Sequence, residues 1–138
     1  MQLAQSMSDP QKFGRPTALD IDAQTGTLYI ADATKCRICS LATANRDNSG
    51  SSGGKGSGSD DDDDEPDGLT TIAGGLVTGL QDGRGEQSWF KRPFGICFHD
   101  ARVAVLVADT HNSAIRRVTL PDGTVTAVWP PPKQHQIA

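Results

Sequence analysis

Aromatic side chains are scarce in this chain of 138 residues, in which four Phe, two Trp and one Tyr together make up 5%. Aliphatic side chains must therefore supply most of any core, because burial stabilises a fold in proportion to the apolar area removed from water. No apolar run approaches the roughly 18 residues of a membrane-spanning helix, and the polar N-terminus does not have the basic-then-apolar pattern of a secretory signal. We therefore expect a soluble protein of the cell interior that does not contact a membrane.

Cysteine is also rare, and its odd count of three excludes a simple disulfide scaffold and favours a reducing compartment. Cys36 and Cys39 form a Cys-x-x-Cys pair, which is compatible with zinc binding or redox chemistry. A structural zinc site usually needs four ligands, and the sequence offers no second pair of Cys or His at suitable spacing. A redox thiol is favoured at a helix N-terminus, whereas this pair falls on a predicted strand. We interpret both as packing residues and predict no metal and no other cofactor.

The formal net charge of −4 is unevenly distributed along the chain. Residues 44–67 hold eight of the 17 acidic residues and two of the 13 basic ones, so the remainder carries 9 acidic and 11 basic residues. Residues 44–66 are rich in Gly, Ser and Asp, and we predict a disordered insert because the run Asp60–Asp64 repels itself and stays solvated. Calcium binding is the alternative, but calcium sites space their oxygen ligands around a turn. The near-neutral remainder gives little reason to expect nucleic-acid binding.

The chain contains an internal repeat that relates residues 13–41 to residues 90–118 at an offset of 77. The matching landmarks are Phe13 and Phe90, Pro16 and Pro93, Asp32 and Asp109, Ile38 and Ile115, and Leu41 and Val118. The later motif Asp67-Gly68 recurs as Asp122-Gly123 at an offset of 55, so the first copy holds 77 − 55 = 22 extra residues. A period of about 55 residues is close to the longest repeats of β-propellers.

Each copy is predicted to form four short antiparallel strands, because runs of β-branched and aliphatic residues alternate with turn signals. The expected strands are 18–22, 27–31, 36–41 and 69–73 in the first copy, and 95–98, 103–108, 114–120 and 124–128 in the second. Ile38 and Leu41 are three residues apart, as are Ile115 and Val118, whereas residues on one face of a strand are two apart. We therefore expect a bulge in the third strand of both copies.

Three motifs resemble those of the NHL repeat family. They are F-x-R-P-x-G-I at 90–96, A-D-T-H-N-x-x-I-R-R-V at 108–118, and T-I-A-G-G at 71–75 followed by D-G-R-G at 82–85. The resemblance covers residues 13–73 and 90–128, and the second copy is the better match, since the first has Ala33 and Lys35 where Thr110 and Asn112 fit the family. The resemblance implies a β-propeller, commonly of six blades.

The expected fold class is all-β: a partial β-propeller with two four-stranded antiparallel blades of an NHL-type, six-bladed, TolB-like propeller. The expected parts are a loose N-terminal segment (1–12), a first blade with the insert (13–76), an inter-blade loop and second blade (77–129), and a Pro-rich tail (130–138). Blades need neighbours on both faces, and closed rings use about four to eight of them. Two blades leave two faces uncovered, so we expect further blades in cis or in trans.

Asp32 and Asp109 end matching strands, which makes them the first candidates for a metal- or substrate-binding carboxylate. Because the residue recurs in each copy, whereas a catalytic residue needs to occur once, we interpret each as a turn aspartate that accepts a backbone N–H bond two residues on. The three histidines, His99, His111 and His135, are scattered, and no Ser/His/Asp arrangement or phosphate-binding loop stands out. The chain is therefore predicted not to be an enzyme, and no small-molecule substrate is evident.

Candidate partner-binding residues lie in and just before the third strands: Lys35, Arg37, Arg116 and Arg117, with His111 and Asn112 in the preceding turn. The alternative is that these charges are solvated at strand edges, where they oppose edge pairing. The resemblance implies a non-catalytic protein-interaction scaffold whose partner is another protein. RNA binding through Arg116 and Arg117 is the first alternative. A fragment of a propeller enzyme, or of a thioredoxin-like/NHL multidomain protein, is the second, since one fold serves many functions.

Overall fold

A computed structural model of the chain describes residues 12–43 and 69–131. The predicted insert 44–66, nearly all of the N-terminal segment 1–12 and the end of the Pro-rich tail lie outside the described residues. The described residues form β-strands and three short 3-10 helices, Gly85–Gln87 (η3), Asp100–Arg102 (η4) and Thr110–Asn112 (η5). No helix in this part of the chain is long and apolar enough to cross a membrane.

The first copy folds into a four-stranded antiparallel sheet with strand order β1-β2-β3-β4. The strands are Pro16–Asp22 (β1), Thr27–Asp32 (β2), Arg37–Ala42 (β3) and Leu69–Gly74 (β4). The backbone N–H groups of Thr25 and Gly26 close the turn between β1 and β2 on the carbonyl of Asp22. The order is that of an antiparallel meander in which each strand pairs with the next along the chain.

The second copy repeats this meander and adds one strand. Its strands are Pro93–His99 (β6), Ala104–Asp109 (β7), Ala114–Thr119 (β8) and Thr124–Trp129 (β9). A two-residue strand from the linker, Gly83–Arg84 (β5), pairs with β9 and gives the order β5-β9-β8-β7-β6. The predicted all-β class and the eight predicted strands are confirmed, whereas the expectation of four strands in the second sheet is wrong by β5.

The two copies match in backbone detail as well as in strand order. Cys36 and Ser113, which are 77 residues apart, precede the third strands with left-handed φ angles of 50° and 51°. The pairing register shifts between Ile38 and Cys39 in one sheet and between Ile115 and Arg116 in the other, so a bulge interrupts the pairing of the third and fourth strands in both copies.

The prediction of a bulge in the third strand is wrong, however, because the extra residue lies on the fourth strand in both copies. Ile38 belongs to the core cluster that contains residues of both sheets, whereas Leu41 packs on a second cluster. The two residues therefore lie on opposite faces of β3, as ordinary strand alternation requires. The bulge instead accommodates an extra residue on the pairing strand β4, where Ile38 pairs with Ala73 and Cys39 with Thr71.

Strand pairing also corrects the alignment of the fourth strands. Leu41 pairs with Leu69 and the equivalent Val118 pairs with Val125, so β4 and β9 correspond at an offset of 56, rather than the 55 inferred from the Asp-Gly motifs. The corrected offset matches Leu69 with Val125, both of which are buried. Matching buried apolar residues is a better guide to strand register than matching a turn motif. A shift of one residue would turn every side chain of the strand to the opposite face of the sheet.

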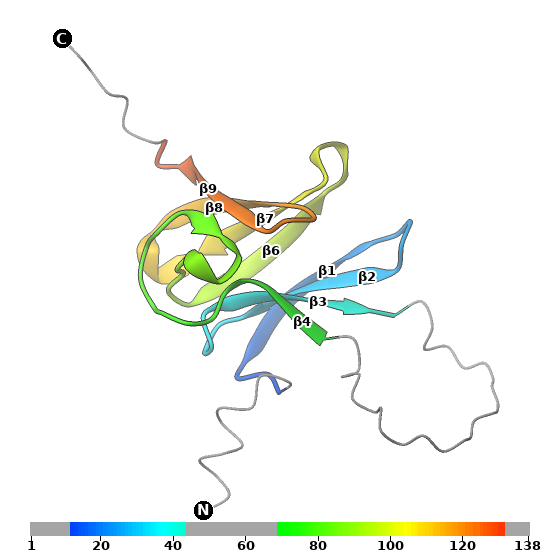
Figure 1. Cartoon of the computed structure of the whole chain (residues 1–138), viewed down its shortest axis with the longest axis horizontal. Coiled ribbons are helices and arrows are strands. Elements are labelled where there is room, and N and C mark those ends of the chain that lie inside the picture. The colour runs from blue at the N-terminus through cyan, green and yellow to red at the C-terminus, as the bar shows by residue number, and fades with distance from the viewer. Residues whose placement is uncertain (1–11, 44–68, 132–138) are drawn as a thin grey trace, which may run out of the picture.

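The main core lies between the two sheets. It combines Tyr29, Ala31, Ile38 and Ala73 of the first sheet with Val105, Val107, Val118 and Val125 of the second, and Phe90 from the linker. Figure 1 shows β1 and β6 close together where the sheets meet, and these first strands make the most extensive strand contact between the sheets. The rings of Tyr29 and Phe98 stack across this junction with centroids 5.5 Å apart.

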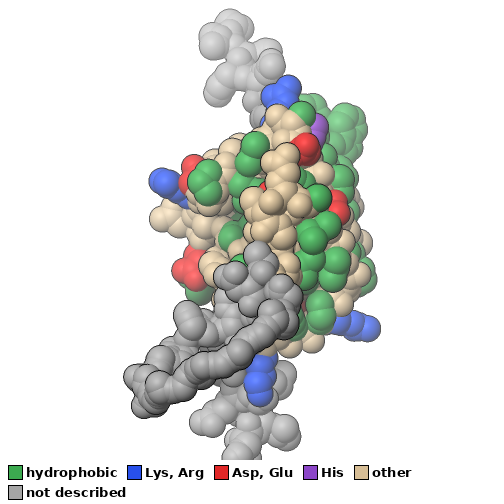
Figure 2. All heavy atoms as spheres, turned by 90° about the vertical axis from the view of Figure 1, so that its right-hand side faces the viewer, with side chains coloured by type: hydrophobic (Ala, Val, Ile, Leu, Met, Phe, Trp, Pro, Cys, Tyr) green, Lys and Arg blue, Asp and Glu red, His purple; other side chains and the backbone are tan. Residues whose placement is uncertain are grey.

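Each sheet also has an outer face, which points away from the other sheet. On the first sheet, Ile30, Cys39 and Leu69 form a second buried cluster, whereas Leu19 and Ile21 of β1 are 60% and 45% exposed. On the second sheet, Cys97 and Ile115 are exposed and line a shallow hollow of about 260 Å³ with Gly95, Leu106 and Ala108. Figure 2 shows hydrophobic side chains gathered along one side of the surface. The predicted uncovered faces are therefore present, but that of the first sheet is partly buried.

A glycine at the junction provides a test of the packing. Gly123, in the β8–β9 turn, has a φ of +77°, and a Cβ there would lie 2.3 Å from the carbonyl oxygen of Ile72 in β4. Gly85 has a similar φ of +60°, but a Cβ there would meet no atom within 4 Å. Both Gly→Ala changes should therefore cost about 1–2 kcal/mol of left-handed strain. Gly123→Ala should cost about 1–3 kcal/mol more through overpacking, and equal losses in urea denaturation of the two variants would contradict the observed contact between the sheets.

Candidate functional site

The most elaborate polar arrangement of the first copy is built around Asp32 at the end of β2. Its carboxylate accepts hydrogen bonds from the backbone N–H groups of Gly14 and Arg15, the latter at 2.8 Å, and from Nε of Arg37 at 3.1 Å. Arg37 also donates to the Thr71 hydroxyl and to the carbonyl of Lys12. Both charged side chains are buried, so the ion pair fixes the segment that leads into β1 against the β2–β3 corner.

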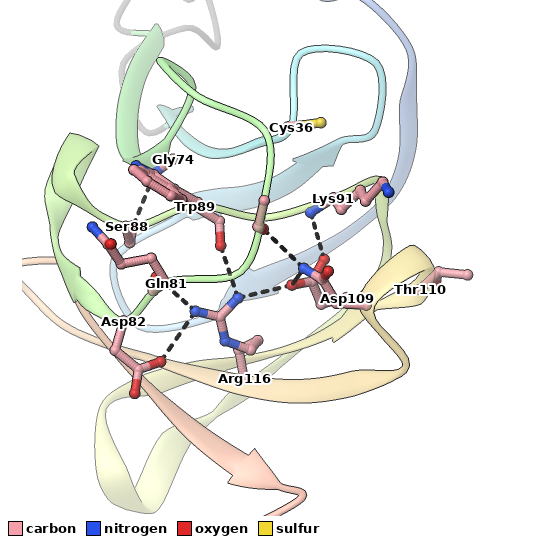
Figure 3. Close-up of polar contacts among 12 residues, drawn as sticks. Cys36, Gly74, Gln81, Asp82, Ser88, Trp89, Lys91, Asp109, Thr110 and Arg116 are labelled. Atoms are coloured by element: carbon pink, nitrogen blue, oxygen red, sulfur yellow. Dashed lines mark hydrogen bonds and ion pairs between the residues drawn. The ribbon is translucent and has the colours of Figure 1, made fainter. Parts of the chain in front are cut away.

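The second copy builds a denser arrangement around Asp109 at the end of β7 (Figure 3). The Asp109 carboxylate accepts the backbone N–H of Lys91 at 2.8 Å and Nη1 of Arg116 at 2.8 Å. The guanidinium of Arg116 also donates to the carbonyls of Trp89 and Gln81, each at 2.9 Å, and reaches Asp82 at 3.1 Å. It lies 4.9 Å from the centre of the Phe90 ring.

These two arrangements hold equivalent backbone groups. The accepted N–H groups of Gly14 and Lys91 are 77 residues apart, as are the carbonyls of Lys12 and Trp89 that receive the arginines. The arginines themselves are not equivalent, since Arg37 corresponds to Ala114 and Arg116 to Cys39. The arginine of each copy therefore reaches the equivalent backbone carbonyl from a different position of the third strand. A structural role permits this, whereas a reaction shared by the two copies would need its reacting groups at the same positions in both.

The expectation for the two aspartates is thus corrected in detail. Asp32 and Asp109 do accept backbone N–H bonds, but the donors lie 17 or 18 residues earlier in the chain rather than two residues later. The contacts join the start of each copy to the end of its second strand. The local turn interpretation missed this because the first strand brings distant residues back to the same corner.

The six predicted partner-binding residues are not brought together as one surface. Arg37 and Arg116 are buried in ion pairs, which corrects the expectation that they are solvated or offered to a partner. The Asn112 amide donates to Asp109 and to the Gly79 carbonyl, and Lys35 donates to the carbonyl of Lys12. His111 is exposed and Arg117 is half-buried. Partner binding by the four residues other than Arg37 and Arg116 stays a prediction.

The Cys-x-x-Cys residues point into different parts of the core. Cys36 packs in the cluster between the sheets, whereas Cys39 is buried in the outer cluster of the first sheet. Burial raises the pKa of the Cys39 thiol to about 11, which opposes formation of the thiolate needed for metal or redox chemistry. Among residues 12–43 and 69–131, no three His, Cys, Asp or Glu side chains cluster as metal ligands would.

A polar contact between the sheets was not anticipated from the sequence. The Asp20 carboxylate of β1 accepts the backbone N–H of Phe98 in β6 at 2.7 Å, and the nearby Thr17 hydroxyl donates to the carbonyl of Phe94 at 2.8 Å. The N–H groups of Phe98 and then of Ile21 hold the pKa of the Asp20 carboxyl below its usual value. An aspartate among the apolar residues of a strand gives no sequence signal for such a contact.

The lowered pKa of Asp20 predicts a pH dependence. A carboxyl whose pKa falls on folding contributes stability above its unfolded pKa of about 3.9, and this stability is lost as the pH falls below that value through the folded pKa. We expect Asp20→Asn to remove part of the acid sensitivity, so that wild type loses more unfolding free energy than the variant between neutral pH and about pH 3. Urea denaturation at both pH values measures the difference. Identical losses would show that Asp20 does not contact the second sheet in solution.

Comparison with known proteins adds information about the fold. No protein-family model matches the sequence, and no curated protein matches it. The structure is similar to that of an auxiliary nutrient binding protein from Bacteroides ovatus, with a TM-score of 0.53 and 16% identity over 79% of this chain. A protein of the same description from Bacteroides thetaiotaomicron gives a TM-score of 0.49 at 18% identity over 82% of this chain. The chain spans 24% and 22% of the lengths of those two proteins, and at such identities the likeness concerns the arrangement of strands alone.

Proposed function

We propose that this chain forms two consecutive blades of an NHL-type β-propeller and serves as a non-catalytic protein-interaction scaffold. The propeller is supported by the recurrence of strand order, register shifts and left-handed residues at an offset of 77. It is further supported by the contact between the first strands of the two sheets, because the first strand of each blade faces the axis of a propeller. The resemblance of the sequence motifs to NHL repeats is the reason for proposing the NHL type of β-propeller.

The main support for the scaffold function is that the prominent charged side chains of the repeat are buried whereas several apolar side chains are exposed. The prominent charges of the repeat are buried in ion pairs within the chain, whereas Leu76 of the linker and Trp129 at the end of β9 are 68% and 62% exposed. Exposed apolar side chains that lie near one another are typical of protein-interaction surfaces, and Val77 and Leu80 of the linker, 44% and 57% exposed, follow Leu76 in the chain. Binding of a polyanion, by contrast, depends on accessible Lys and Arg, and Arg116 of the RNA hypothesis is fully buried.

A tandem chain tests the propeller. Three complete copies joined end to end would supply six blades in one polypeptide, so their outer faces should cover one another. At a protein concentration low enough to suppress association, we expect this chain to melt at a higher temperature than the single copy and to bind less of the dye ANS per copy. Three independent units with an unchanged melting temperature and unchanged dye binding per copy would contradict the propeller.

An RNA-binding measurement separates the scaffold from its first alternative. Fluorescence anisotropy with a labelled single-stranded RNA at low salt should show no binding by a protein-interaction scaffold of this charge distribution. Binding that weakens with added salt and falls further in Arg117→Ala would replace the scaffold by the RNA-binding function. Lys133, which is also basic, provides the matched control substitution Lys133→Ala.

A further inference from the structure

The outer face of each sheet carries the residues equivalent to those that the other sheet uses in the interface between the two sheets. In the interior, the first sheet offers Tyr29, Ala31 and Ile38 to the second. The equivalent residues of the second sheet, 77 positions later, are Leu106, Ala108 and Ile115, and these line the exposed hollow on its outer face. The interior surface of one sheet therefore has an apolar, uncovered counterpart on the other.

The complementary surface is repeated in the same way. The second sheet meets the first through Ile96, Phe98, Val105, Val107 and Val118, of which the valines are fully buried. Their equivalents on the outer face of the first sheet are Leu19, Ile21, Leu28, Ile30 and Leu41, all of which are again apolar. Leu19 and Ile21, which correspond to Ile96 and Phe98, are the most exposed of these. The chain thus presents both halves of its own internal interface, on opposite sides.

We propose that a second copy of this chain occupies these faces, with the outer face of its first sheet packed on the outer face of the second sheet of its neighbour. The proposal rests on the proposed propeller. Such a head-to-tail contact uses two different surfaces, so repeated addition closes a ring or forms a fibre. Two blades per copy and six blades per ring give a closed ring of three copies. Trp129, equivalent to the smaller Ala73, enlarges the contact at the outer rim.

The internal interface identifies residues that meet between copies. Inside the chain, the Asp20 carboxylate of β1 contacts the backbone N–H of Phe98 in β6 at 2.7 Å. The equivalents are Cys97 on the outer face of the second sheet and Ile21 on the outer face of the first. Cys97 of one copy should therefore lie beside Ile21 of the next. Cys97 is exposed, whereas Cys36 and Cys39 are buried, so Cys97 is the accessible native thiol of the chain.

Disulfide trapping tests this contact. The variant Ile21→Cys, treated with oxidised glutathione at high protein concentration, should form disulfide-linked species up to three copies on a non-reducing gel. The matched control Leu76→Cys introduces a thiol at a 68% exposed linker position, away from the predicted contact, and should not form this ladder. Addition of Cys97→Ser to Ile21→Cys should abolish it. Sedimentation of the wild type should approach a mass of three times 14.6 kDa as the concentration rises.

The outcomes separate this inference from the proposed function. A wild type that stays monomeric at high concentration, together with equal cross-linking of Ile21→Cys and Leu76→Cys, would overturn self-assembly. A dimer as the largest species, or growth well beyond three copies, would overturn the closed ring. If the tandem chain gains stability in any of these cases, the propeller stands and its remaining blades come from another polypeptide or from the same one. If the tandem chain gains nothing, the propeller is lost as well.

Discussion

Asp109→Ala is expected to lower the free energy of unfolding by about 3–5 kcal/mol, because it leaves the guanidinium of Arg116 buried without its closest counterion. Both side chains of this pair are fully buried, and Nη1 of Arg116 lies 2.8 Å from the Asp109 carboxylate. This loss is a large part of the total free energy of unfolding of an ordinary domain, which is about 5–15 kcal/mol. Urea denaturation followed by circular dichroism measures it, and the variant should be largely unfolded in buffer if the wild type is near the lower end of that range.

Two matched variants isolate the cause of this loss. Asp82→Ala removes the other carboxylate that reaches Arg116, but the Asp82 side chain is 52% exposed, so the cost should stay below about 1 kcal/mol. The double variant Asp109→Leu with Arg116→Met removes both buried charges and should recover part of the stability lost in Asp109→Ala. Equal destabilisation by Asp82→Ala and Asp109→Ala would show that burial does not govern this ion pair.

Phe90→Ala is expected to cost about 3–5 kcal/mol through the cavity it leaves. Phe90 is fully buried between the two sheets, and the guanidinium of Arg116 lies over its ring. The ring also packs so closely on Gly74 that a Cβ added to this glycine would lie 2.7 Å from it. Loss of the cation–π contact adds about 1–2 kcal/mol to the cavity term. Because the linker residue joins both sheets, the variant should lose the cooperativity of unfolding as well as its midpoint.

Phe94→Ala provides the control for Phe90→Ala. The two residues are four positions apart in the chain, but Phe94 is 40% exposed on β6. The same truncation should therefore cost only a fraction of the Phe90→Ala value, since little apolar area returns to water. Similar losses for the two variants in thermal unfolding would contradict the assignment of Phe90, rather than Phe94, to the centre of the junction.

Most strands could be predicted because their signal is local. Runs such as Thr27–Ala31 and Val103–Ala108 combine β-forming residues with adjacent turn residues, and both lie within or next to observed strands. The strand β5, Gly83–Arg84, could not be predicted in this way. Neither residue favours strands, and the pairing with β9 arises from the path of the linker.

The polar interior of the two copies could be predicted only in part. Recurrence of Asp32 and Asp109 indicated a structural role, but burial of Arg37 and Arg116 depends on carbonyls of Lys12 and Trp89 that the fold brings back to the strand ends. Arginines are usually exposed, so the residue type alone predicted an exposed position for side chains that are in fact buried. An available signal was the presence, in each copy, of an arginine in the strand after the aspartate.

The packing of the first sheet against β6 of the second is tested most directly by a nuclear Overhauser measurement between Tyr29 of β2 and Phe98 of β6. These rings stack with centroids 5.5 Å apart and planes inclined by 9°, and Tyr29 is the single tyrosine of the chain, so its ring signals can be assigned without ambiguity. We predict cross-peaks between the ring protons of Tyr29 and those of Phe98 in the folded protein. Cross-peaks within each sheet without any between these two rings would contradict the packing on which the propeller and the assembly depend.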